Sequence, residues 1–358
     1  MTTRINRRMV LTRRPVWTAK TDDFTVEQIP VQTPGPGEVL VRVDWIAFDP
    51  AMRGWMSEGP SYAPPVPLGE VMRAHAVGEV VAGEVADCPV GTVVSGNFGW
   101  QTHVIARPSR SAVGLLAHVH DERLGVPLAH KVPEDVPPTA ALGVLGTTGL
   151  TAYFGMLELG QPRPGDVVLV SGAAGATGSV AGQLARMAGA RTIGIAGGPE
   201  KSRWLTEVAG FDHVVDYKNE DVRGRVAEIA PGGVDLFYDN VGGSVLEGGI
   251  ANIAQRGTVV LCGGISSGYS DEATPVGPRN LSTITVRSCV MKGFIVTDFA
   301  ARFAEATARL AGWVRDGRLV WAEDVQTGDV SLAVTTMNRL FDGNNLGKQL
   351  LRLEHGDG

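Results

Sequence analysis

The sequence has little cysteine, no long apolar segment and no excess of basic residues, and each shortage excludes a class of protein. Three scattered cysteines among 358 residues, an odd number, argue against a disulfide framework. No apolar run approaches the length needed to cross a bilayer. The formal net charge is −6, the isoelectric point is near 5.7 and no basic stripe is present, so we expect no nucleic-acid partner.

Length and composition are those of an ordinary soluble enzyme. Of the 358 residues, 44% are apolar and 20% are charged, which suits a sizeable core and two domains. A basic cluster near the N-terminus superficially suggests a targeting peptide, but it lacks a long apolar core and a small-residue cleavage site. Strand-like sequence follows directly, so we interpret the cluster as a basic strand edge and expect a cytoplasmic protein. Its residues are Arg4, Arg7, Arg8, Arg13 and Arg14.

Glycine, by contrast, is abundant, and its most informative cluster lies between a predicted strand and a predicted helix. Val167–Ser171 is apolar and strand-like, and Gly-Ala-Ala-Gly-Ala-Thr-Gly follows at 172–178. Val180, Leu184 and Met187 then recur at helical spacing. This order is typical of a dinucleotide-binding unit, in which backbone N–H groups hold a pyrophosphate at the positive end of the helix.

The fingerprint of this unit, G-x-G-x-x-G, is incomplete at one position. Ala173 occupies the first glycine position, and Gly175 and Gly178 occupy the other two. A glycine pattern by itself can also mark a structural turn. The strand before it, the helix after it and a second strand at 191–196 favour the nucleotide site.

The residues after the second strand bear on the choice of cofactor. NAD-preferring sites place Asp or Glu about 20 residues beyond the glycines, where the acid binds the ribose hydroxyls. Here Gly197 and Gly198 follow the strand, and Pro199 turns Glu200 into the first turn of a helix. Lys201 comes next and suits a 2′-phosphate; the alternative is a solvated lysine at a helix start. The missing acid and the lysine together favour NADPH.

The organisation of the chain changes near Lys131. Before it, alternating apolar residues and many prolines predict short strands and loops. From Gly146 onward, strands and helices alternate, which predicts a doubly wound parallel sheet. The predicted strands are Val167–Ser171, Thr192–Ala196, His213–Asp216, Val234–Asp239 and Thr258–Cys262. The predicted helices are Ser179–Ala188, Glu200–Ala209, Glu220–Ala230 and Ser244–Ile253. A helix over Phe299–Asp316 and a strand over Asn345–Leu353 are expected to return the chain to the first part.

Several motifs along the chain resemble one protein family. They are Arg14-Pro15, Pro34–Arg42, Asp49–Gly54, Gly149–Tyr153, Asp239–Gly243 and Asn345–Lys348. With the β-rich part, the nucleotide-binding part and the returning strand, they resemble the medium-chain dehydrogenase/reductase superfamily. The resemblance covers almost the whole chain and is specific to the zinc-independent branch of prostaglandin/leukotriene reductases, plant alkenal double-bond reductases and bacterial curcumin reductases. It implies an α/β fold with a Rossmann domain at 139–314 and a GroES-like β-rich domain formed by 1–138 and 315–358.

The chain departs from the family pattern at three places near the expected substrate pocket. The segment 107–136 is longer than usual, Thr147-Thr148 replaces the common Met-Pro, and Gly268 is an extra residue before Tyr269. These departures bear on substrate specificity rather than on reaction class.

Zinc-dependent relatives hold their catalytic metal with Cys and His and usually carry a four-cysteine lobe. This chain has one cysteine before residue 200, Cys88, and no C-x-x-C pair. His75 stands alone, and His118 and His120 have no third ligand nearby in sequence, so packed or solvated roles are favoured for all three. We therefore expect no metal. Hydride addition to an activated carbon–carbon double bond does not require the Lewis acid that alcohol chemistry uses.

The resemblance also implies a cofactor site built from loops at the ends of several strands. Gly175, Ala176, Thr177 and Gly178 would line the pyrophosphate, and Lys201 and Tyr217 would hold the 2′-phosphate and adenosine side. The remaining implied contacts are Asn240, Cys262, Gly263, Ile265, Ser266, Phe294, Ile295, Val296 and Asn345. Alternatives stay open. Asn240 and Asn345 could serve merely to complete turns, and Cys262 and Phe294 could contact the cofactor through their backbone atoms alone.

The implied substrate pocket is aromatic and apolar, which suits a hydrophobic enone or enal. Its residues are Met52, Trp55, Tyr62, Trp100 and Tyr269. Tyr269 and Tyr62 are the candidate catalytic residues, because a tyrosine with an ordinary pKa near 10 stays protonated at neutral pH and can donate to a nascent enolate. The alternatives are that the Tyr269 ring only packs its loop and that water supplies the proton.

The sequence thus predicts an NADPH-dependent ene-reductase that reduces the double bond of small hydrophobic α,β-unsaturated ketones or aldehydes without a metal. A zeta-crystallin-like quinone oxidoreductase and a non-catalytic NADPH-binding redox sensor are the alternatives. Neither a nucleic acid nor a membrane is expected as a partner. A homodimer is expected from the resemblance, and because Thr283–Arg287 is predicted to be a β-branched strand with an exposed edge.

Overall fold

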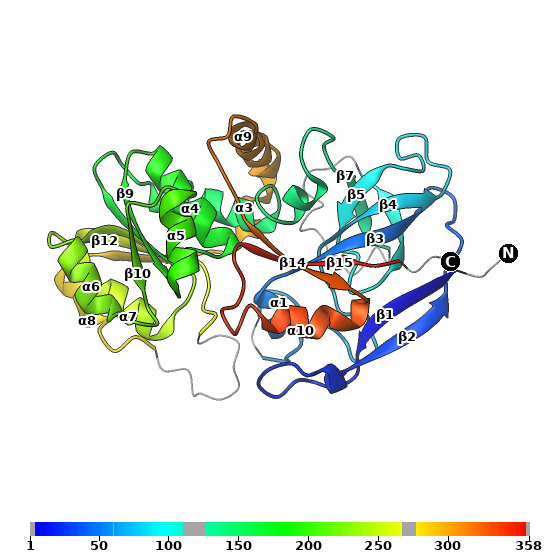
Figure 1. The fold of residues 1–358 in the computed structure, drawn as a ribbon, viewed down its shortest axis with the longest axis horizontal. Helices are drawn as coiled ribbons and strands as arrows, with labels where there is room; N and C mark the ends of the chain where they lie inside the picture. The colour runs from blue at the N-terminus through cyan, green and yellow to red at the C-terminus, as the bar shows by residue number, and fades with distance from the viewer. Residues whose placement is uncertain (1–3, 60, 110–125, 267–276, 356–358) are drawn as a thin grey trace.

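The computed structural model describes residues 4–59, 61–109, 126–266 and 277–355, which form two parts side by side along the longest axis of the molecule (Figure 1). Each part is organised around its own sheet. Gly268, Tyr269, His118 and His120 lie outside the described residues, as does much of the segment 107–136. The predicted α/β fold with a second, β-rich part is confirmed, while the exact domain boundaries stay a prediction.

The β-rich part contains a seven-stranded sheet in the order β14-β15-β3-β4-β5-β7-β6, which curls back on itself because β3 also pairs with β6. A separate antiparallel pair, β1 (Ile5–Leu11) and β2 (Phe24–Pro30), lies beside it. The strands of the large sheet are β3 (Val39–Phe48), β4 (Ala76–Ala82), β5 (Val93–Gly96), β6 (His103–Pro108), β7 (Leu128–Lys131), β14 (Glu323–Gly328) and β15 (Lys348–Leu353). The helices of this part are α1 (Ala51–Trp55) and α10 (Ala333–Asn338), with short 3-10 turns at Thr21–Asp23, Pro138–Leu142 and Val330–Leu332. Because β15 pairs antiparallel with β3, the predicted return of the chain to the first part is confirmed.

The other part is a six-stranded parallel sheet in the order β10-β9-β8-β11-β12-β13. Its strands are β8 (Val167–Ser171), β9 (Arg191–Ala196), β10 (His213–Asp216), β11 (Val234–Asp239), β12 (Ile253–Leu261) and β13 (Val290–Gly293). Its helices are α3 (Thr147–Tyr153), α4 (Ala176–Met187), α5 (Pro199–Glu207), α6 (Val222–Ile229), α7 (Gly243–Ala251), α8 (Ser282–Val286) and α9 (Phe303–Arg315), with a π-helix at Phe154–Gly160 and a 3-10 helix at Val296–Arg302.

Both faces of this sheet are covered, which explains why its central strands are apolar throughout. Val168 and Val170 of β8 belong to one core cluster, which also contains residues of α3, α4 and α9. Leu169, between them in sequence, belongs to a second cluster with residues of α6 and α7. Successive strand residues point to opposite faces, so a strand buried on both sides loses the usual alternation of apolar and polar residues.

One predicted strand is wrong. Thr283–Arg287 lies largely in helix α8, where Arg287 N donates to Thr283 O at 3.0 Å. The strand at this end of the sheet in the described part of the chain is instead β13, which pairs with β12 in the register Thr258 to Val290. β-Branched side chains favour a strand only where another strand is close enough to pair with them. Here the available strand, β12, pairs with β13, which follows α8 in the chain.

An ion pair within the β-rich part holds the loop that reaches across to the other part. Lys348 begins β15, has a side chain only 3% exposed, and donates from Nζ to Asp49 Oδ1 at 2.5 Å. Asp49 lies between β3 and α1, whereas the loop before Lys348 reaches across to the parallel-sheet part. The pair therefore fixes that loop to the β-rich part.

Candidate active site

The loops that carry the predicted cofactor residues all lie at one edge of the parallel sheet. In a parallel sheet the carboxyl ends of all strands lie at the same edge, and ligands bind there, where consecutive connections leave a strand in opposite directions. β8 is that strand, because the chain goes from it to β9 on one side and later to β11 on the other. The loops at this edge are 172–175 after β8, 197–198 after β9, 217–221 after β10, 240–242 after β11, 262–266 after β12 and 294–295 after β13.

The glycine-rich turn after β8 is too tight for side chains at its critical position. A Cβ on Gly178, in the first turn of α4, would lie 2.3 Å from Gly172 O, so only glycine lets the helix start so close to the strand. Gly175 is the extended residue that precedes the helix. The first N–H groups of a helix have no partner within it, and the helix dipole adds positive potential there. The turn therefore fits the predicted pyrophosphate.

The alanine in place of the first glycine is accommodated by the neighbouring strand. Ala173 is fully buried, and a Cβ placed on Gly194 of β9 would lie 3.0 Å from the Ala173 methyl group. Glycine at 194 thus provides the room that alanine at 173 occupies. The departure from the fingerprint changes the packing behind the turn rather than the surface that faces the ligand.

The end of β9 has no free carboxylate, as the sequence predicts. The nearest strand-end acid is Asp216 on β10, whose Oδ1 accepts from Gly198 N at 2.9 Å and from Lys218 N at 3.1 Å. Burial would raise the pKa of Asp216, but these hydrogen bonds and the one from Asn219 outweigh it and hold the pKa below its ordinary value. The acid is used to shape the turn at 197–198.

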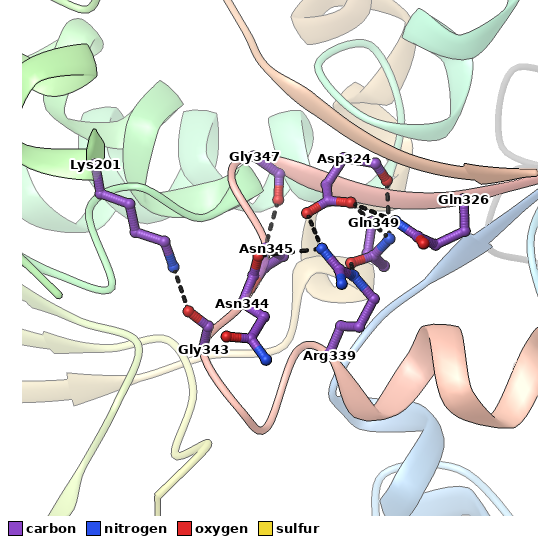
Figure 2. A network of polar contacts seen from close by, with 9 residues as sticks. All are labelled: Lys201, Asp324, Gln326, Arg339, Gly343, Asn344, Asn345, Gly347 and Gln349. Atoms are coloured by element: carbon purple, nitrogen blue, oxygen red, sulfur yellow. Dashed lines mark hydrogen bonds and ion pairs between the residues drawn. The ribbon is translucent and has the colours of Figure 1, made fainter. Parts of the chain in front are cut away.

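Lys201 lies in the first turn of α5, and its Nζ donates to Gly343 O at 2.8 Å (Figure 2). Burial and then the charge of Lys218 lower the pKa of Lys201. Tyr217 and Lys218 cover the same turn, since a Cβ on Gly197 would lie 2.8 Å from the Tyr217 ring and 3.0 Å from Lys218 Cε. Two lysines and a tyrosine hydroxyl thus gather where the ribose-binding acid of an NAD site would be.

Lys218 was missed by the sequence reasoning. The signal that could have identified it was its position, directly after Tyr217 at the end of the strand next to β9. Because β10 and β9 are parallel neighbours, a cation that follows one strand lies beside the turn that follows the other.

The loops after β11 and β12 are joined by a buried network. Asp239 accepts from Ser171 Oγ at 2.6 Å and from Gly242 N at 2.9 Å, and Asn240 Nδ2 donates to Ser171 O at 2.7 Å. From the next loop, Cys262 N donates to Asp239 O at 2.8 Å. The structure therefore brings Asn240 and Cys262 to the same edge as the glycine-rich turn.

The other residues predicted for this loop follow the same course. Gly263 N donates to Asp239 O at 3.2 Å, and Ile265 N to Asn240 O at 3.4 Å. Ser266 bonds Val241 O through both its backbone N–H and its hydroxyl. The hydrogen-bonding groups of this loop are therefore largely used in holding the loop itself.

Phe294 lies directly after β13, and its ring packs into the core. A Cβ on Gly155 would lie 2.7 Å from Phe294 Cζ, and the ring also meets Phe299 edge-on at 6.4 Å between centroids. The backbone of Ile295 and Val296 continues into a 3-10 helix, closed by Asp298 N donating to Ile295 O at 3.0 Å.

The loop 343–347 crosses from the β-rich part to the glycine-rich turn. Gly347 N donates to Ala174 O at 2.7 Å, and Gly347 forms a parallel bridge with Gly175. Asn345 Nδ2 donates to Gly347 O at 3.0 Å, within the loop (Figure 2). Gly347 has φ +70°, and a Cβ there would strike Ala322 O, so glycine is required for this approach.

Two residues predicted to line the substrate pocket are buried in the core. Met52 on α1 and Trp100 are completely buried, and the Trp100 ring packs against Phe24 and Phe48 with centroids 5.2 and 5.6 Å away. Neither side chain reaches the surface, and their part in substrate binding stays a prediction.

The other two described pocket candidates reach the surface. Trp55, on α1, is partly buried and has the Arg73 guanidinium 5.6 Å above its ring. The Tyr62 side chain is exposed. Their part in substrate binding stays a prediction.

Comparisons with known proteins agree with this arrangement. Family models match residues 7–113, as the N-terminal domain of oxidoreductase, and residues 176–312, as zinc-binding dehydrogenase. Within the described ranges, no group of three or more His, Cys, Asp and Glu residues is placed to hold a metal ion. In the same ranges no helix is both long and apolar enough to cross a membrane.

Individual relatives extend over nearly the whole chain. The NADPH-dependent curcumin reductase of Escherichia coli is 35% identical over 357 residues and covers 98% of both chains. The NADP⁺-dependent 2-alkenal reductase of Nicotiana tabacum is 31% identical over 352 residues, 97% of both. The crystal structure of CurA from Vibrio vulnificus in complex with NADPH superposes with a TM-score of 0.85 at 34% identity, covering 98% of this chain and 99% of that one. Together with the two-sheet fold and the glycine-rich turn beside β8, these matches show that the chain belongs to the zinc-independent branch of the medium-chain dehydrogenase/reductase superfamily, a family of NADP-dependent oxidoreductases.

Proposed function

We propose that this protein is an NADPH-dependent reductase of the carbon–carbon double bond in α,β-unsaturated ketones or aldehydes. The observation that carries the proposal is the cofactor cradle, in which the helix start packed against the glycine-rich turn lies at the same sheet edge as a turn flanked by Lys201 and Lys218. Similarity over nearly the whole chain to a 2-alkenal reductase and a curcumin reductase supports the choice of substrate class.

The residues present fit NADPH. The N–H groups at the start of α4 would hold the pyrophosphate, since glycine at 178 lets the helix start close to the end of β8. Lys201, Lys218 and Tyr217 would hold the 2′-phosphate, because they supply two cations and a hydroxyl where an NAD site carries an acid. Asn240, the loop 262–266, the backbone at 294–296 and Asn345 remain the proposed contacts toward the nicotinamide.

When bound, the cofactor supplies a hydride, which adds to the β-carbon of the substrate while a proton is added at the α-carbon. The residues of the protein would hold the β-carbon of the substrate about 3–3.5 Å from the hydride-donating carbon of the nicotinamide. They would also donate a hydrogen bond to the carbonyl oxygen as it gains negative charge. Tyr269 and Tyr62 are the proposed donors, and Trp55 and Tyr62 the proposed apolar contacts of the substrate.

The observations weigh against a thiol-based redox sensor at two cysteines. Burial raises the pKa of the Cys262 thiol to about 12, and burial also raises the pKa of Cys88. A thiol reacts through its thiolate, so neither is activated for oxidation at neutral pH. A quinone reductase remains the second candidate, since it would use the same cofactor cradle.

The test is steady-state oxidation of NADPH with a 2-alkenal, a cyclic enone and a quinone as acceptors. We expect the alkenal or enone to have the highest kcat/KM, to gain two hydrogens by mass spectrometry and to keep its carbonyl group. Chelator treatment should leave these rates unchanged. A higher kcat/KM for the quinone would favour quinone reduction, and tight NADPH binding without turnover of any acceptor would favour a non-catalytic binding protein.

A further inference from the structure

The loop 343–347 is held between two cations that come from different parts of the molecule. From the parallel-sheet part, Lys201 Nζ donates to Gly343 O at 2.8 Å. From the end of α10 in the β-rich part, Arg339 Nη2 donates to the next carbonyl, Asn344 O, at 3.3 Å. Figure 2 shows Lys201 and Arg339 reaching adjacent peptide groups from opposite sides.

Arg339 is itself held firmly by the two strands beneath it. Its Nη2 forms an ion pair with Asp324 Oδ2 at 2.9 Å, and its Nε donates to Gln349 Oε1 at 3.3 Å. Asp324 of β14 and Gln349 of β15 are paired residues in the parallel register. Gln349 is fully buried and donates to Asp324 O at 2.8 Å, while Gln326 Nε2 donates to Asp324 Oδ1 at 3.0 Å.

A planar guanidinium can serve several acceptors at once in fixed directions, which a lysine ammonium on its flexible stem cannot do. Arg339 therefore ties the Asn344 carbonyl to a rigid pair of strands and so limits where the neighbouring Gly343 carbonyl can lie. That carbonyl occupies one of the three donor directions of Lys201 and leaves two for another ligand. The charge of Asp324 also acts on Lys201, where it raises the pKa against the larger effect of burial.

We propose that Arg339 is a positioning residue for cofactor selection. By anchoring the loop 343–347 on β14 and β15, it orients the Lys201 ammonium toward the 2′-phosphate and raises the preference for NADPH over NADH without touching the cofactor. This inference rests on the proposed function, in which Lys201 binds that phosphate.

The experiment is calorimetric titration of the full-length protein with NADP⁺ and with NAD⁺, which gives the ratio of the two Kd values without turnover. The variants are Arg339→Met, Lys201→Ala and the double variant. We expect Lys201→Ala to lower the preference for NADP⁺ by about tenfold or more, and Arg339→Met to lower it by about three- to fivefold with Kd for NAD⁺ nearly unchanged. In the Lys201→Ala background, Arg339→Met should have no further effect on the ratio, because its influence passes through Lys201.

Arg7→Met is the matched control, since it breaks a similar ion pair in the same part of the molecule, between Arg7 Nε and Asp329 Oδ2 at 2.8 Å. It should leave the ratio unchanged. Arg339→Lys keeps a charge beside Asp324 but loses the planar guanidinium, so it should lower the preference for NADP⁺ much as Arg339→Met does. If the methionine variant does not fold, the lysine variant tests the proposal in its place.

Two results would overturn the inference: equal weakening of NADP⁺ and NAD⁺ by the Arg339 variants, or a further loss of preference when Arg339→Met is added to Lys201→Ala. An unchanged ratio in the Arg339 variants, with the ratio reduced in Lys201→Ala, would overturn it as well. If Lys201→Ala itself leaves the ratio unchanged, the assignment of Lys201 to the phosphate fails instead, which is a failure of the proposed function.

Discussion

Lys201 and Lys218 carry like charges beside one turn. Their electrostatic repulsion is unfavourable, and a bound anion would relieve it. Burial and the neighbouring charge both disfavour the ammonium form of Lys201, which lowers its pKa. A phosphate bound between the two lysines would favour the charged form of both. The pair thus prepares the turn at 197–198 for a doubly charged group.

The lowered pKa of Lys201 leads to a pH dependence that NADH should not share. The ammonium is the form that binds phosphate, and it is lost as the pH rises through a pKa below the ordinary value for lysine. We therefore expect KM for NADPH to rise with pH while the pH is still below the ordinary pKa of lysine, about 10.4, earlier than an unperturbed lysine would allow. Steady-state measurements from neutral pH up to that value check it. Lys201→Arg should remove the rise because arginine stays charged, and an equal rise in that variant would assign the titration to a group other than Lys201.

Two tyrosines are candidates for donating to the developing enolate. On this hypothesis Tyr269→Phe lowers kcat by about tenfold or more with little change in NADPH affinity, since the hydroxyl would act mainly in the transition state. Tyr62→Phe is the companion variant. Full kcat in the first and a loss in the second would assign the role to Tyr62, and full kcat in both would leave water as the proton source.

Among the elements, α4 decides whether the cofactor can be held at all. Its first turn approaches β8 so closely that the position of Gly178 has no room for a methyl group, with Gly172 O only 2.3 Å from the Cβ it would carry. A backbone atom cannot move aside as the end of a side chain can. The helix start would therefore have to shift away from the strand and carry its N–H groups with it.

Gly178→Ala should accordingly weaken NADPH binding by about tenfold or more, which corresponds to about 1.4 kcal/mol. Gly312→Ala is the matched control, because Gly312 lies inside helix α9 and a Cβ there meets nothing within 4 Å. The control should bind NADPH normally and keep or slightly raise the melting temperature, since alanine favours helix by about 1 kcal/mol. Fluorescence titration and thermal unfolding measure both effects, and equal NADPH affinity of the two variants would contradict the argument.

For the whole molecule, the outer edge of β13 pairs with no strand among the described residues. Exposed apolar residues lie at and near this edge, and Val290 on β13 is 48% exposed. An open strand edge with apolar side chains invites pairing with a second copy. We therefore retain the predicted homodimer but assign its edge to β13 instead of to Thr283–Arg287.

Light scattering at micromolar concentration should give a mass of twice the 37.7 kDa chain. Val290→Lys should shift the protein toward the monomer, because a charge would be buried at the proposed contact. Val208→Lys serves as the control, since Val208 is similarly exposed at 53% but follows α5, away from β13. A monomeric mass of the unaltered protein, or equal masses for the two variants, would count against this edge.

Features that depend on residues close together in the chain can be predicted without the fold. The strand, glycine-rich turn and helix at 167–187, the missing acid after β9 and the returning strand could be predicted because periodicity, glycine spacing and the lack of a charge are local patterns. Which distant segments meet depends instead on the packing of the folded chain. That packing places most of Thr283–Arg287 in a helix, buries Met52 and Trp100 in the core, brings Lys218 beside Lys201 and places the Gly343 carbonyl against the Lys201 ammonium. These outcomes depend on sheet order and on the contact between two domains, and side-chain chemistry alone does not specify either.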